Sequence, residues 1–153
     1  MPKMWQLEYG GNMVVIKILV LTMLSIMSIM DLKSKRINLY FLIPFLVSGV
    51  ICNLSYQLVP LTSLIGGVGI GIVLLMISFV TKGKIGSGDG IILMVTGLFL
   101  GFYDNLLLLL SATFLSAIVG AFILLKKGMN KNYEIPFIPF LLLSFAGGLI
   151  IWR

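Results

Sequence analysis

The sequence predicts an all-α integral membrane protein with about six transmembrane helices. Hydrophobic residues make up 59% of the 153-residue chain and charged residues only 10%, against about 45–50% and about 25% in a typical soluble domain. A soluble fold of this size could not bury so much apolar surface. The apolar residues also gather in long runs, and clusters of Lys and Arg separate these runs. We therefore expect one polytopic membrane domain over residues 1–153.

Six segments meet or approach the length of about 20 mostly apolar residues that a transmembrane helix needs. The expected spans are Asn12–Met30, Ile37–Leu54, Leu61–Val80, Gly90–Gly101, Leu106–Leu125 and Ile135–Trp152. The fourth is short and follows a glycine-rich stretch. Glycines in the third and fourth spans include GxxxG pairs, which favour close helix packing. A cleaved signal sequence is the alternative for the first span, but that span is longer than a signal core and no small-residue cleavage site follows it.

The basic residues alternate between loops. Three clusters follow the first, third and fifth spans: Lys33, Lys35 and Arg36; Lys82 and Lys84; and Lys126, Lys127 and Lys131. The expected loops at residues 53–60 and 103–105 carry no Lys or Arg. The positive-inside rule puts the basic loops in the cytoplasm and both termini outside the cell membrane, with residues 1–12 as a short extracytoplasmic segment. We expect these charges to set topology rather than to bind nucleic acid.

Residues that are missing from the chain exclude several kinds of site. The chain has no histidine and a single cysteine, Cys52. Ser-His-Asp and Cys-His catalysis, an HExxH zinc site, cysteine-rich zinc clusters and an intramolecular disulfide are therefore excluded. We expect neither a metal nor an organic cofactor.

The acidic residues are few enough to consider one by one. They are Glu8, Asp31, Asp89, Asp104 and Glu134. Asp104 and Glu134 each precede an apolar run and are expected to be structural, and Glu8 is expected to be solvated. Asp31, taken alone, is better explained as a juxtamembrane cap or a lysine partner than as a functional residue.

Asp31 and Asp89 together indicate chemistry. Two complete crossings separate them, so both carboxylates return to the cytoplasmic face, where Asp31 closes the first span and Asp89 opens the fourth. An aspartic protease needs one ionised carboxylate to activate water and one protonated carboxyl group to support the substrate carbonyl. A helix C-terminus disfavours negative charge and an N-terminus favours it. Our hypothesis is that Asp31 is the protonated group and Asp89 the ionised one, although Lys33 opposes this division.

Three segments, in this order, resemble the type IV prepilin peptidase family. They are Asp31 with the basic stretch that follows it, Gly86-Ser87-Gly88-Asp89, and Ile135-Pro136-Phe137-Ile138-Pro139-Phe140-Leu141. The resemblance implies the architecture of GxGD intramembrane aspartyl proteases, with Asp31 and Asp89 as catalytic residues. It also implies that Gly86, Gly88, Pro136, Phe137 and Pro139 support the site. Two departures bear on substrate specificity: Ile138 replaces the family's glycine, and Ile37-Asn38-Leu39 replaces Ile-Pro-Asn.

The resemblance implies an endopeptidase that removes the short basic leader from prepilin or pseudopilin substrates at the cytoplasmic membrane face. A preflagellin or other signal-peptide peptidase of the same class is one alternative. A small proton- or ion-coupled transporter or a membrane assembly factor is an alternative from another class. Long family members also methylate the new N-terminus and carry a cysteine-based metal site. Cys52 alone cannot build a four-cysteine site, so we expect no methyltransferase activity.

Overall fold

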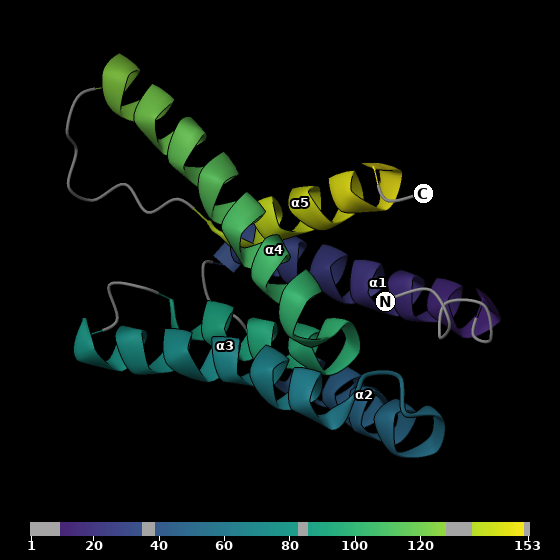
Figure 1. The fold of residues 1–153 in the computed structure, drawn as a ribbon. Coiled ribbons are helices and arrows are strands. Elements are labelled where there is room, and N and C mark those ends of the chain that lie inside the picture. Colours follow the sequence, from purple (N-terminus) through teal and green to yellow (C-terminus); the bar gives the residue numbers. More distant parts are fainter. Residues whose placement is uncertain (1–9, 35–38, 83–85, 128–135, 152–153) are drawn as a thin grey trace.

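The computed structural model describes residues 10–34, 39–82, 86–127 and 136–151, and every regular element in these ranges is a helix (Figure 1). The elements are α1 (Gly10–Ser34), the short 3₁₀-helix η1 (Leu39–Leu42), α2 (Ile43–Tyr56), α3 (Leu61–Val80), α4 (Ser87–Lys127) and α5 (Ile138–Ile151). The prediction of an all-α protein is confirmed for this part of the chain.

Three of the described helices are long and apolar enough to cross a membrane. The spanning segments are Val14–Lys33, Leu61–Val80 and Ser87–Lys126. Two further apolar segments, Tyr40–Ser55 and Ile138–Ile150, are shorter. Large apolar side chains also lie on the outer surface, and Phe79 is 88% exposed. Such a surface would promote aggregation in water but is normal against lipid, so these helices indicate insertion into a membrane.

Helix α4 consists of two arms that meet at Gly101. The backbone of Gly101 is not helical (φ 72°, ψ −165°), and Figure 1 shows the chain turning back at this point. The first arm corresponds to the expected fourth span and the second arm to the fifth. Our prediction of a loop at residues 103–105 was wrong, because these residues are helical. Gly101 makes the turn by itself, and the Phe102 N–H, at the start of the second arm, donates to Ser63 Oγ at 2.9 Å.

The first arm of α4 packs closely against α3. A Cβ atom at Gly67 would lie 2.8 Å from backbone atoms of Gly97 and Gly101, and one at Gly97 would overlap the backbone of Gly67. Only glycine leaves room for such an approach, which is the packing that GxxxG spacing favours. The third span and the first arm of α4 are therefore joined backbone to backbone.

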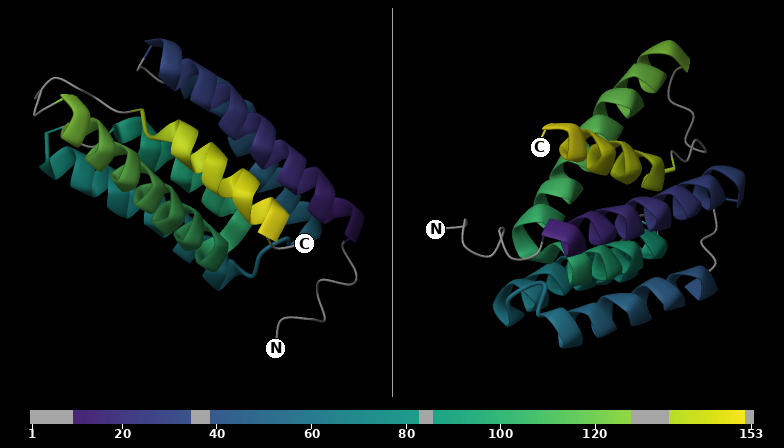
Figure 2. Two further views of the ribbon diagram at one scale, coloured as in Figure 1. Left: turned by 90° about the horizontal axis from the view of Figure 1, so that it is seen from above. Right: turned by 90° about the vertical axis from the view of Figure 1, so that its right-hand side faces the viewer.

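The apolar core lies between α1, α4 and α5. Its fully buried side chains come from these three helices: Val20, Met23, Leu24, Met27, Ile92, Leu93, Val95, Ala112, Ile138 and Leu141. In Figure 1 and the turned views of Figure 2, α1 and α4 end towards the side where α5 begins. The start of α1 and the end of α5 lie on the opposite side. This arrangement puts the last turn of α1 beside the first turn of α5.

Candidate active site

Asp31 lies in the last turn of α1 and is 9% exposed. Its Oδ2 accepts a hydrogen bond from the backbone N–H of Ile138 at 3.3 Å. Ile138 is the first residue of α5, and the first N–H groups of a helix have no partner within the helix. Asp31 therefore satisfies a main-chain donor that belongs to an element 107 residues further along the chain.

The segment around Pro136 and Pro139 explains why α5 begins beside Asp31. Proline is well tolerated in the first turn of a helix, where its missing N–H is not needed. The carbonyl of Phe137 accepts the first bonds of the helix, from the N–H groups of Phe140 at 3.0 Å and Leu141 at 3.3 Å. The side chain of Ile138 is fully buried in the core. This segment fixes the start of α5 and directs one free N–H to Asp31.

Asp89 lies in the first turn of α4 and is half-buried. Its backbone N–H donates to the carbonyl of Gly86 at 3.2 Å. A Cβ atom at Gly86 would lie 2.9 Å from Asp89 Oδ2, so the carboxylate lies directly over this glycine. Gly88, between them in sequence, is also half-buried. The first glycine of the GxGD sequence leaves the space that the aspartate side chain occupies.

The two aspartates are electrostatic neighbours. Burial and the charge of Asp31 both act on the carboxylate of Asp89. Charges interact strongly only at short range in a protein, and more strongly where water is excluded. A hydrogen bond thus joins the last turn of α1 to the first turn of α5, and Asp89, in the first turn of α4, lies within electrostatic range of Asp31. Two carboxylates in such a setting can share protons.

The structure changes the basis of our hypothesis about the protonated group. We expected the C-terminal end of the first helix to disfavour charge on Asp31. The helix continues to Ser34, and the carboxylate also accepts an N–H from the N-terminus of α5, which stabilises negative charge. The C-terminus of α1 therefore disfavours negative charge on Asp31, and the N-terminus of α5 favours it. The sequence indicated only the first of these two effects.

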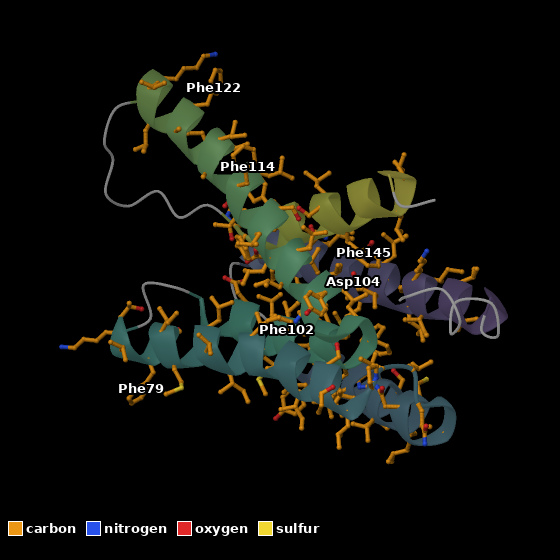
Figure 3. All side chains as sticks on the ribbon, in the orientation of Figure 1. Phe79, Phe102, Asp104, Phe114, Phe122 and Phe145 are labelled. Atoms are coloured by element: carbon orange, nitrogen blue, oxygen red, sulfur yellow. The ribbon has the colours of Figure 1, made fainter. Side chains whose placement is uncertain are left out.

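The other acidic residues do not join this site. Asp104 is exposed on the second arm of α4, where Figure 3 shows it near α1, and the charge of Lys17 acts on it. The structural role that we expected for Asp104, a helix cap, stays a prediction. Glu8 and Glu134 lie outside the described residues, as do Lys35, Arg36, Lys84 and Lys131. Within the described ranges, no group of three or more His, Cys, Asp or Glu side chains could hold a metal ion.

The sequence reasoning missed one buried polar residue. We placed Asn105 in an outer loop, but its side chain is fully buried and hydrogen-bonds from the second arm of α4 to α3 and to the first arm. The sequence did contain an indication of this burial, because Asn105 directly precedes five leucines. The neighbouring Tyr103 and Asp104 made the stretch resemble a loop.

Comparisons with known proteins cover the part of the chain that holds both aspartates. A family model described as the type IV leader peptidase family matches residues 18–125. The matched segment contains Asp31 and Asp89 and ends before Pro136. No curated protein and no solved structure matches the chain.

Proposed function

The chain belongs to the type IV leader peptidase family, and we propose that it is an intramembrane aspartic endopeptidase that removes the short basic leader from prepilin-like proteins. The observation that carries this proposal is the proximity of Asp31 and Asp89 next to the start of α5. These carboxylates come from separate helices; Asp31 is buried and Asp89 is half-buried. Family membership favours a peptidase over a transporter or an assembly factor that moves protons or ions.

The proposed reaction is a hydrolysis that the two carboxyl groups catalyse. The ionised group takes a proton from the attacking water, and the protonated group donates to the carbonyl oxygen of the scissile peptide bond. Breakdown of the tetrahedral intermediate breaks the C–N bond, and the leaving nitrogen takes up a proton. One water is consumed, and the products are a carboxylate and an amine. Neither a metal ion nor an organic cofactor takes part in this scheme.

We further propose that residues 1–153 form one peptidase domain whose six helical segments cross the membrane. The two arms of α4 count as separate crossings. The second crossing of the chain consists of α2, which η1 lengthens at its start. Lys33 and Lys126 lie in the last turns of α1 and of the second arm of α4, and Lys82 follows α3. By the positive-inside rule this side faces the cytoplasm, which places both termini outside and the two aspartates at the cytoplasmic face. Lipid covers the exposed apolar surface, and the substrate is a prepilin or pseudopilin.

Co-expression with a panel of prepilins, pseudopilins and preflagellins tests the proposal. We expect a gel shift for a prepilin-type substrate, with N-terminal sequencing of the product showing a single cut. Processing of preflagellins alone would show that the chain is a preflagellin peptidase, the alternative within the same class. Intact substrates throughout, with the enzyme present in the membrane, would contradict the proposal.

A further inference from the structure

A fully buried carboxamide joins three helical segments at the corner of α4. Asn105 lies four residues after the break at Gly101, and its side chain is 0% exposed. Its Nδ2 donates to the carbonyl of Gly67 on α3 at 3.0 Å and to the carbonyl of Leu93 on the first arm at 2.9 Å. Its Oδ1 accepts from Thr96 Oγ1 at 2.7 Å. A single side chain therefore connects α3 with both arms of α4.

The bonding pattern of this amide distinguishes it from an ordinary packing residue. An amide in apolar surroundings is strongly unfavourable unless it is hydrogen-bonded, and the leucines that follow Asn105 could fill the same interior without that requirement. Both Nδ2 bonds end on main-chain carbonyls. Their geometry depends on where the backbones of α3 and the first arm lie. A fully bonded buried network of this kind specifies one arrangement of its helices.

The segment that Asn105 holds also carries Asp89. Leu93 lies about one helical turn after Asp89, so the bond to its carbonyl anchors the first arm close to the carboxylate. The bond to Gly67 connects the same amide to α3 at the point where Gly67 and Gly97 are in backbone contact. Asp31, in contrast, is held by α5. The position of Asp89 relative to Asp31 therefore depends on how the first arm is fixed.

We propose that Asn105 is a positioning residue for Asp89: its amide locks the first arm of α4 against α3 and the second arm, and so sets the separation of the two carboxylates. This inference rests on the proposed function. The side chain of Asn105 is fully buried, so it does not reach the substrate directly and acts through the backbone of Leu93.

Asn105→Leu tests the proposal, with Asn53→Leu as the matched control. The Asn53 amide also donates to a carbonyl of the first arm, that of Leu98 at 2.7 Å, but it comes from α2 and donates its other bond to Gly49 within α2. We expect Asn105→Leu to lower kcat about tenfold to a hundredfold with KM within about twofold, because a small misplacement of catalytic groups has effects of this size. Asn53→Leu should stay within about threefold of wild type on the same basis.

A distance measurement tests the positioning without relying on activity. Spin labels at Leu32→Cys and Ser87→Cys, in a Cys52→Ser background, report on the two chain segments next to Asp31 and Asp89. Both positions are exposed. We expect the distance distribution to shift or broaden with Asn105→Leu and to stay unchanged with Asn53→Leu. An unchanged distribution with Asn105→Leu would overturn the proposal. Because no substrate is involved, this result stands even if the chain cleaves no prepilin.

Substitutions of Thr96 test the proposal even if the Asn105→Leu variant does not fold. Thr96→Ser keeps the hydroxyl that donates to Asn105 and loses a methyl group, whereas Thr96→Val keeps the shape and loses the hydroxyl. If hydrogen bonding positions the arm, Thr96→Ser retains most of the wild-type kcat and Thr96→Val loses about tenfold. The reverse order would show that packing alone matters and would overturn the proposal.

Discussion

Asp31 and Asp89 are held in position by different parts of the chain. Asp31 is buried at the end of α1 and accepts an N–H from Ile138, far along the sequence. Asp89 is half-buried at the start of α4, directly over Gly86 in its own turn. The contact that holds Asp31 is long-range, whereas the nearest contact of the Asp89 carboxylate lies in its own turn.

This difference shows how one site can combine a local support with a long-range support. The glycine turn at Asp89 needs only a few adjacent residues, so it is readable as a short motif. The support of Asp31 needs α5 to begin at the correct place, which depends on packing between α1 and α5. Changes at Gly86 should therefore affect Asp89, and changes at Ile138 should affect Asp31.

Removing either carboxylate should have the largest effect. Asp31→Asn and Asp89→Asn should each lower cleavage by about 10²–10⁴-fold or more, because an amide cannot exchange the required proton. Both variants should still insert into the membrane. Leader loss from a co-expressed prepilin, followed by gel shift, measures the effect. Substantial activity in one variant would remove that aspartate from the mechanism.

Gly86→Ala should have the next largest effect. A Cβ atom there would lie 2.9 Å from Asp89 Oδ2, so the carboxylate must move, and we expect kcat to fall about a hundredfold. Gly69→Ala is the matched control, since a Cβ at Gly69 meets nothing within 4 Å. Equal activity of the two alanine variants in a leader-cleavage assay would mean that the position of Asp89 over Gly86 is unimportant.

Ile138→Pro should have a smaller effect and should act through Asp31. Proline removes the N–H that Asp31 accepts, at a position in the first helical turn where proline is tolerated. A hydrogen bond to a charged group is worth about 1.5–3 kcal/mol, so we expect a loss of about tenfold to a hundredfold in kcat/KM. Ile138→Val keeps the N–H and should cost only about 0.5–1.5 kcal/mol of stability. Similar activities of these two variants would show that the bond to Asp31 has no role in catalysis.

Asp104→Asn should have the smallest effect. Asp104 is exposed and lies near Lys17, away from the start of α5. An exposed ion pair contributes about 0–1 kcal/mol, so leader processing should stay close to wild type. A severe loss of cleavage in this variant, with normal insertion, would give Asp104 a role that the proposed site does not include.

The local features of the fold were predictable from the sequence. The expected third span, Leu61–Val80, has the bounds of α3, because a polar and proline-containing stretch precedes this apolar run and a lysine pair follows it. The position of Asp89 directly over Gly86 also fits a short motif, the Gly86-Ser87-Gly88-Asp89 stretch. These features depend on residues close together in sequence.

The features that join distant residues were not predictable. The bond from Ile138 to Asp31 depends on the packing of α5 against α1. The buried amide of Asn105 depends on a sharp turn at Gly101, and a single glycine among the many in this chain does not mark such a turn. The bond to Asp31 and the burial of Asn105 were missed for the same reason. Contacts between helices in a membrane leave little trace in an apolar sequence.

The central claim is that Asp31 and Asp89 of one chain form one proteolytic site. Its most direct test is leader cleavage of a purified prepilin by wild-type enzyme in liposomes, compared with an equal mixture of Asp31→Asn and Asp89→Asn proteins. We predict that mass spectrometry will show one released leader with the wild type and none with the mixture. Cleavage by the mixture, or none by the wild type, would contradict the claim.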